Sequence, residues 1–243
     1  MKNTVYSIQK TQISQYKMPA IESNMYLLTE EHEALIVDPN INEQALTQLR
    51  EEKVQRLTVL LTHEHFDHIS GINWLRQFFE VEVICSAACA QNLSDSSRNM
   101  AKFWDVLIMD KPEEAKVAGE AVKDVEYVCC ADKIFESEFS IDWQGHSLRL
   151  KSAPGHSKGG ALIWLDEKIL FSGDNLVNGT GVICRFPGGS KKEYAAVTRP
   201  ILESLPDDLF VCPGHGEPGP LGQLRQYTEL FNACTDRRVP AEG

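Results

Sequence analysis

The sequence has no long apolar run and no concentration of positive charge. No stretch of its 243 residues approaches the ~20 consecutive apolar residues that a membrane-spanning helix needs. The N-terminus also lacks the apolar stretch of about 7–15 residues that marks a secretory signal. The 24 lysines and arginines stand against 35 aspartates and glutamates, for a net charge of −11. Such a surface repels phosphate backbones and anionic lipid. We therefore expect a cytoplasmic protein that binds neither nucleic acid nor membranes.

Cysteine is present, but in no arrangement that indicates chemistry. The seven cysteines are odd in number, form no C-x-x-C pair and follow neither a disulfide framework nor a zinc-knuckle spacing. The sequence also lacks the G-x-S-x-G motif of serine hydrolases. We expect reduced structural thiols, as is usual for cytoplasmic proteins, and a reaction that uses neither a serine nor a cysteine nucleophile.

Apolar segments typical of buried strands recur along the chain, and many are followed by segments with helical spacing. The expected strands are VYSIQ (5–9), MYLLT (25–29), ALIVD (34–38), LTVLL (57–61), VEVICS (81–86), FSIDW (139–143), SLRLKSA (147–153), ALIWLD (161–166), KILFSGD (168–174) and the strand of LFVCPGH (209–215). The expected helices are 41–52, 69–79, about 191–204 and a short one that closes the chain. Two β-rich halves with helices between them predict an α/β protein with two sheets packed face to face and helices outside.

The densest group of ligand-type side chains is THEHFDH (62–68), which directly follows the run LTVLL. It holds three of the seven histidines within six residues. His63 and His65 alternate along an extended segment, so both can point to the same side. Asp67 and His68 then lie on the turn into the next helix. Neutral imidazole and carboxylate suit zinc, and they also suit iron or manganese.

Three further ligand-type residues stand at strand ends beside glycine, namely His156, Asp174 and His215. Each follows an apolar strand and a tight turn, where glycine lets the backbone approach a metal closely. The pattern therefore predicts a metal site built from several strand ends. His32 and His146 lack this setting, and we expect both to be solvated turn residues.

The order of these motifs resembles that of the metallo-β-lactamase superfamily. THEHFDH is followed by GH at 155–156, GD at 173–174 and GH at 214–215, and the opening SNMYLL…ALIVDPN segment also matches. The resemblance covers nearly the whole chain. It implies a single domain over residues 1–243 with an αββα sandwich, in which two mixed β-sheets pack face to face, helices lie outside and the metal site lies along one edge.

The resemblance also implies a role for each ligand. His63, His65 and His156 would bind the first of two divalent metal ions; Asp67, His68 and His215 would bind the second; Asp174 would bridge them, and Asp38 would lie behind the ligands. Zinc is the first choice of metal, with iron or manganese as alternatives. A hydroxide held by the metals would attack a carbonyl. Asp67 would also hold or relay the proton.

Within the superfamily, PGHSKGG and FPGGS…LPDDLFVCPGHGEP are most similar to the glyoxalase II-like thioester hydrolases. The chain ends 28 residues after His215, before the helical domain that grips glutathione in glyoxalase II. We therefore expect hydrolysis of a thioester or other small ester, with a substrate other than a glutathione thioester.

Two alternative activities and one non-catalytic function remain. One activity is a lactonase, although Val177 stands where lactonases often carry tyrosine. The other is a mononuclear-iron persulfide dioxygenase that uses the first-metal ligands alone. A non-catalytic binding protein would have lost a ligand, and no ligand is lost here. We expect the partner to be a small-molecule substrate. The sequence does not decide between a monomer and a homo-oligomer.

Residues 95–128 form a long insertion with a cluster of apolar side chains at 100–109. Insertions of this length in a compact domain are usually functional or flexible. One interpretation is a helical flap packed on the core. The other is a helical lid in which Phe103 and Trp104 wall the substrate pocket.

Overall fold

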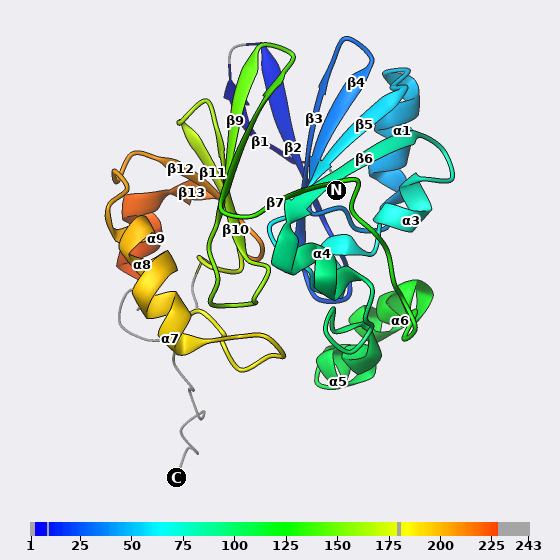
Figure 1. Ribbon diagram of the computed structural model, residues 1–243. Coiled ribbons are helices and arrows are strands. Elements are labelled where there is room, and N and C mark those ends of the chain that lie inside the picture. The colour runs from blue at the N-terminus through cyan, green and yellow to red at the C-terminus, as the bar shows by residue number, and fades with distance from the viewer. Residues whose placement is uncertain (1–2, 9, 179–180, 228–243) are drawn as a thin grey trace.

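The computed structural model describes residues 3–8, 10–178 and 181–227. Two β-sheets pack face to face, and helices lie on the outer side of each sheet (Figure 1). The first sheet contains, in spatial order, β1 (Asn3–Ile8), β2 (Thr11–Lys17), β3 (Asn24–Glu30), β4 (Glu33–Val37), β5 (Arg56–Leu60), β6 (Glu80–Ser86) and β7 (Lys133–Phe135). Strands β1 to β4 pair antiparallel, and β4 to β7 pair in parallel.

The second sheet comes from the later part of the chain. In spatial order it contains β13 (Gly219–Pro220), β12 (Phe210–Pro213), β11 (Ile169–Gly173), β10 (Ala161–Leu165), β9 (His146–Ser152) and β8 (Glu138–Trp143). Its strands pair antiparallel except for β11 and β12, which are parallel. Both sheets are therefore mixed, which confirms the predicted fold class.

Helices connect the strands and cover the two outer faces. They are α1 (Glu43–Glu51), α2 (Phe66–Ile69), α3 (Ile72–Leu75), α4 (Ala87–Leu93), the 3-10 turn η1 (Ala101–Phe103), α5 (Trp104–Ile108), α6 (Glu113–Val122), α7 (Lys191–Glu193), the π-helical turn η2 (Tyr194–Thr198), α8 (Arg199–Glu203) and α9 (Leu221–Tyr227). Figure 1 shows α1, α3 and α4 beside the first sheet and α8 and α9 beside the second.

Strands with both faces buried create separate apolar layers. In β4, Ala34 and Ile36 face the layer shared with the helices, while Leu35 and Val37 face the layer between the sheets. The second sheet repeats this pattern, because Trp164 of β10 belongs to a third layer with α8 and α9. Successive side chains of a strand face opposite sides of the sheet, and both sides are apolar here. These strands therefore appear in the sequence as continuous apolar runs. The layers together form the αββα sandwich.

Two local predictions were wrong for identifiable reasons. The polar segment of β2 was not expected as a strand, but the buried amide Nε2 of Gln15 donates to Asn24 on β3 at 2.8 Å, which gives this polar group a partner inside the sheet. The expected helix over 69–79 is broken into α2 and α3. A Cβ at Gly71 would lie 2.6 Å from the carbonyl oxygen of Asn40, so the backbone turns closely against the loop after β4.

Five cysteines are free thiols as predicted, namely Cys85, Cys89, Cys129, Cys130 and Cys212. Cys184 is disulfide-bonded, so for this residue the expectation of a reduced thiol was wrong. Within the described parts of the chain, no helix is long and apolar enough to cross a membrane.

Candidate metal centre

The predicted ligands lie at one edge of the sandwich because parallel strands end there. THEHFDH follows β5, Asp174 follows β11, and His215 follows β12, which is parallel to β11. His156 lies on the loop between β9 and β10. The carboxyl ends of parallel strands meet at one edge, where α/β proteins commonly bind ligands. Loops from both sheets thus contribute to a single cluster.

The cluster contains two compact ligand groups that share this edge, and a third grouping, of Asp38, His63 and His68, overlaps both. The first comprises His63, His65 and His156, and the second comprises Asp67, His68 and His215. Within each group, the candidate ligand atoms all lie within 4.8 Å of one another. These groups are the two triads that the resemblance implies, and loops from different sheets complete both of them.

Asp174 lies between the two groups. Its Oδ2 is 3.4 Å from Nε2 of His156 and 3.6 Å from Nε2 of His215, and its Oδ1 is 3.6 Å from Nε2 of His68. One carboxylate thus approaches imidazoles of both triads. This is the position that a bridging ligand requires.

Burial and mutual repulsion keep the first triad neutral. Burial, followed by the neighbouring imidazole of His156, lowers the pKa of His65 to about 3. Burial, followed by the imidazoles of His68 and His65, also lowers the pKa of His63 well below its usual value. Burial likewise lowers the pKa of His156. A neutral imidazole has a free lone pair, which is the form that binds a metal.

The second triad has the opposite electrostatics. Burial alone would lower the pKa of His68, but Asp67, Asp174 and Asp38 outweigh it and raise this pKa well above its usual value. Burial alone would raise the pKa of Asp67, yet His68 and His215 hold it well below its usual range. The carboxylates of this half are therefore ionised and compensate cationic neighbours.

Several buried polar atoms of the cluster have no hydrogen-bond partner among the described residues. They are Nε2 of His63, His65 and His68 and Oδ1 of Asp174. A buried polar atom without such a partner is costly. Divalent cations held by the two triads would provide partners for buried atoms of this kind, and the imidazole and carboxylate donor set matches zinc and similar transition metals. The residues present therefore fit a metal centre.

Asp38 lies behind this cluster, as its predicted role requires. Its Oδ2 lies 3.1 Å from Nδ1 of His68, and its Oδ1 accepts the backbone N–H of Thr62 at 2.8 Å. The hydroxyl of Thr62 donates to the same carboxylate. Asp38 thus orients His68 from the side away from Nε2. Such outer partners fix the tautomer and angle of ligand imidazoles.

The two aromatic residues predicted to wall the pocket have different environments. Trp104 is fully buried, packs edge-on against Phe66 at 5.1 Å between ring centroids and donates its indole N–H to the carbonyl of Gly119 at 3.0 Å. Trp104 is therefore a core residue in this structure, and its prediction as a substrate contact was wrong. Phe103 is 38% exposed, and its contact with substrate stays a prediction.

The two histidines outside the cluster also differ. His32 is exposed in the turn between β3 and β4, as expected. His146 is only 2% exposed, so the expectation of a solvated turn residue was wrong. Its Nδ1 lies 2.7 Å from Asp166, and its Nε2 lies 3.0 Å from the hydroxyl of Thr11 on the first sheet. His146 therefore links the two sheets away from the metal centre.

Two residues of the site were not predicted. Glu64 is completely buried beside the first triad; its place inside the motif was a signal, but its partners were not visible in the sequence. Phe186 stands edge-on to the rings of His65 and His156, at 5.7 and 6.0 Å between centroids. In the sequence, the only indication of this role was the position of an aromatic residue directly before the PGG segment.

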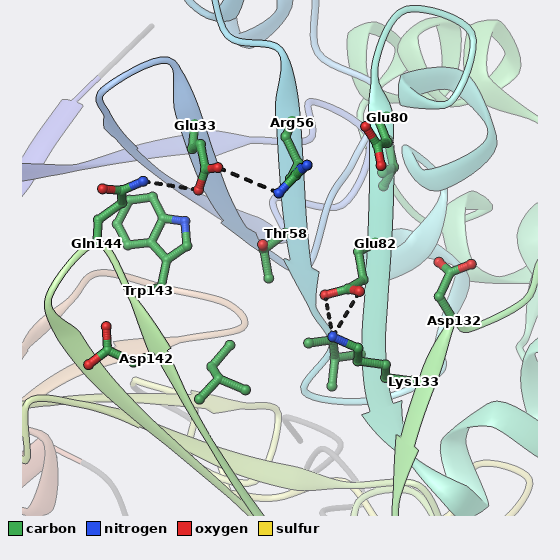
Figure 2. Close-up of a pocket in the computed structure, with 13 residues that line it drawn as sticks. Glu33, Arg56, Thr58, Glu80, Glu82, Asp132, Lys133, Asp142, Trp143 and Gln144 are labelled. Carbon is green, nitrogen blue, oxygen red and sulfur yellow. Dashed lines mark hydrogen bonds and ion pairs between the residues drawn. The ribbon is translucent and has the colours of Figure 1, made fainter.

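A hollow opens at the amino ends of β4, β5 and β6 (Figure 2). The ligand cluster lies at the opposite end of these strands. Its volume is about 740 Å³. Its two basic residues pair with acids of the lining, Arg56 with Glu33 at 3.8 Å and Lys133 with Glu82 at 2.9 Å. Among the described residues that line it, none is histidine or cysteine. The hollow therefore lacks the imidazole donors that gather at the other edge.

An αββα sandwich that gathers imidazoles and carboxylates at one edge defines a class of metal-dependent hydrolases. A sequence model described as the metallo-beta-lactamase superfamily matches residues 18–215, and the chain belongs to this family.

The chain is similar to the hydroxyacylglutathione hydrolase GloC of Haemophilus influenzae, at 30% identity over 88% of this chain and 95% of the relative. It is also similar to a probable metallo-hydrolase, YqgX, of Bacillus subtilis, at 26% identity over 82% of this chain and 89% of the relative. Among solved structures, it resembles the BLEG-1 B3 metallo-beta-lactamase with a TM-score of 0.73 and 27% identity, over 91% of this chain and all of the other. The fold and its relatives therefore place it among the metallo-hydrolases.

Proposed function

We propose that the protein is a dinuclear metal-dependent hydrolase that cleaves a thioester or another small ester. The observation that carries this proposal is the position of Asp174 between two triads in which Nε2 of His63, His65 and His68 lacks a hydrogen-bond partner among the described residues. In the proposed centre, His63, His65 and His156 hold the first ion, Asp67, His68 and His215 hold the second, and Asp174 bridges them. Zinc is the proposed metal, with iron or manganese as alternatives.

Asp67 is the proposed catalytic carboxylate. Bound metal ions would supply Lewis acidity toward a carbonyl and lower the pKa of water. Oδ2 of Asp67 lies 3.2 Å from Nε2 of His68 and 3.3 Å from Nε2 of His215. Those two imidazoles hold its pKa well below the usual range, so Asp67 is ionised and can accept a hydrogen bond from the attacking water. It therefore orients the nucleophile as well as contributing to the second ligand set.

Phe186 is the proposed wall on the first-metal side of the substrate. The ring is half-buried and meets the edges of two ligand imidazoles. Small-molecule pockets are lined mainly by apolar and aromatic groups, with a few polar groups that fix orientation. An acyl chain or a leaving group with apolar carbons would therefore pack here while its carbonyl faces the ligand cluster. Residues 95–128, with Phe103, are the proposed lid on this single domain.

Glutathione thioesters belong among the candidate substrates. The expectation of a different substrate drew on the short segment that follows His215. GloC is named a hydroxyacylglutathione hydrolase, and this chain matches 95% of its length. A protein named for a glutathione thioester is therefore matched almost from end to end. We therefore propose thioester hydrolysis by a cytoplasmic enzyme, with a glutathione thioester as one member of the test set.

The test is a metal determination combined with a substrate screen on protein saturated with zinc, iron or manganese. We expect close to two ions per chain and the highest kcat/KM on a thioester. The screen includes lactones, and it includes persulfides with oxygen consumption as the readout. At most one ion, with oxygen uptake on a persulfide, would establish the dioxygenase alternative. Two bound ions without turnover of any ester would contradict the proposed activity while leaving the metal centre intact.

A further inference from the structure

Glu64 lies between two ligands of the first triad but points away from them. His63 and His65 alternate along an extended segment, so the side chain between them faces the opposite side. The Glu64 side chain is fully buried and belongs to none of the ligand groups of the cluster. No lysine or arginine among the described residues pairs with it. A buried carboxylate without a cationic partner is costly unless several donors satisfy it.

Three donors converge on this carboxylate. Nδ2 of Asn92 donates to Oε1 at 2.7 Å, and the hydroxyl of Ser157 donates to Oε2 at 3.0 Å. The backbone N–H of Gly159 reaches Oε1 at 3.4 Å. All three are neutral, and two of them come from the loop that carries His156. The carboxylate is therefore held by groups that belong to different parts of the sandwich.

These donors connect the two sheets next to the metal centre. Asn92 lies in the last turn of α4, which follows β6 of the first sheet, whereas Ser157 directly follows His156 on the β9–β10 loop of the second sheet. The hydroxyl of Ser86, which caps α4, also donates to the carbonyl of Gly159 at 2.8 Å. Both contacts draw the loop of His156 toward the first sheet.

Gly159 shows how closely the two sides approach. A Cβ at this position would collide with Oε2 of Glu64 and with the backbone of Cys89 on α4. Only glycine leaves space for the carboxylate between the loop and the helix. The distance between the His65 loop and the His156 loop is therefore fixed by a close backbone contact as well as by hydrogen bonds.

We propose that Glu64 is a positioning residue that sets the geometry of the first metal site by tying the loop of His63 and His65 to the loop of His156. This inference rests on the proposed metal centre. Nε2 of His156 lies 3.0 Å from Nδ1 of His65 across the sheet boundary. Small relative movement of the two loops would separate the third ligand from the other two. The second triad does not include the β9–β10 loop and is not subject to this restraint.

The test compares Glu64→Ala with Glu64→Gln in the full chain. We expect Glu64→Ala to lower the affinity of the first site for zinc by about 10–100-fold, the range usual for residues that orient ligands, with a much smaller effect on the second site. Glu64→Gln keeps an acceptor for Asn92, and Ser157 can rotate to accept from the amide, so it should restore most of the affinity. Competition with a chelator measures both sites, and the visible spectrum of Co²⁺ reports the ligand geometry.

Leu93→Ala provides a matched control for general destabilisation. Leu93 is fully buried on the same helix and belongs to the apolar layer beside the first sheet, so its truncation loosens α4 without removing a donor to Glu64. We expect it to lower the melting temperature while leaving the first-site affinity and the Co²⁺ spectrum unchanged. Asn92→Ala should weaken the first site, and in the double variant with Glu64→Ala it should add little, because both act through one contact.

The outcomes separate this inference from the proposed function. Wild-type protein that binds no metal would overturn the proposed centre. Wild-type protein with two sites, together with unchanged affinity in Glu64→Ala or an equal loss in Leu93→Ala, would overturn the positioning role alone.

Discussion

His68 has carboxylates at both nitrogens of its ring, and two of them, those of Asp174 and Asp38, have different roles in the proposed centre. Asp174 approaches Nε2, the nitrogen that faces the cluster, at 3.6 Å. Asp38 approaches Nδ1 on the other side at 3.1 Å. Loss of Asp174 would remove a ligand shared by both ions, whereas loss of Asp38 would change only the orientation of one imidazole.

Asp174→Ala is therefore expected to lower metal content and hydrolysis together while the fold persists. Asp38→Asn is the matched variant, because Asp38 has φ 55 and asparagine tolerates this left-handed backbone. We expect it to cost about 10–100-fold in activity with nearly full metal content. Elemental analysis and kcat/KM measure both. If Asp38→Asn lost as much metal as Asp174→Ala, the assignment of the two carboxylates would be wrong.

Substitution of Gly173 would test how tightly the backbone beside Asp174 is packed. It has φ 52, and a Cβ there would collide with the side chain of Thr62, which holds Asp38. Gly145 has φ 78, and a Cβ there would meet only open space. Gly145→Ala should cost about 1–2 kcal/mol of unfolding free energy from the left-handed backbone alone. Gly173→Ala should cost more and also lower metal affinity. Equal losses in a denaturant titration would show that the contact with Thr62 is unimportant.

At the scale of elements, α5 is fixed to the core by Trp104 and Ile108, whereas Phe103 just before it is partly exposed. Trp104 packs on Phe66 and is hydrogen-bonded to α6, whereas Phe103 is partly exposed. Trp104→Ala should therefore cost about 3–5 kcal/mol of unfolding free energy, as for other large aromatic truncations. Phe103→Ala should stay within about 0.5 kcal/mol. Chemical denaturation distinguishes them, and similar costs would contradict the assignment of Trp104 to the core.

Phe103→Ala also tests the proposed lid. If the lid contacts the acyl or leaving group, this variant should lower kcat/KM on the preferred thioester by about 10–200-fold, as lost apolar pocket contacts generally do. Metal content and activity on a minimal thioester should hardly change. Equal losses on both substrates would indicate a structural flap instead.

The sequence was most informative where strands are apolar and end in ligand-type residues. The alternation of His63 and His65 after a buried strand predicted that both face one point, and glycine marked the turns at His156 and His215. These signals are local, because they depend on residues within a few positions of one another. The fold class followed from the same strands, since their apolar runs imply burial on both faces.

The remaining features depend on contacts between distant parts of the chain. His146 was expected in solvent because of its turn setting, yet its partner Thr11 is 135 residues away. Trp104 looked like a pocket residue by composition, and only the packing of α5 on Phe66 shows otherwise. Alternation indicates that Glu64 points away from the metal, but it does not reveal that Asn92 and Ser157 meet it there.

At the scale of the whole molecule, the cluster joins the two sheets, so metal binding should stabilise the fold. A ligand that binds only the folded state at 100 times its Kd contributes about 2.7 kcal/mol. For a chain of this size, removal of the metal should therefore lower Tm by about 5–10 °C. Thermal unfolding with chelator and after zinc is restored measures the shift. An unchanged Tm in protein shown to have lost its metal would contradict a centre that couples the sheets.

The order of the ligands along the chain also determines when each triad can assemble during synthesis. His63, His65 and His156 precede His215 by at least 59 residues, the difference between 215 and 156. At roughly 5–20 residues per second, this is a delay of about 3–12 s. β12, which carries the segment before His215, is also the last but one strand of its sheet in chain order. A nascent chain can therefore gather the first triad while the second still lacks a ligand, so the two metal sites become available in sequence.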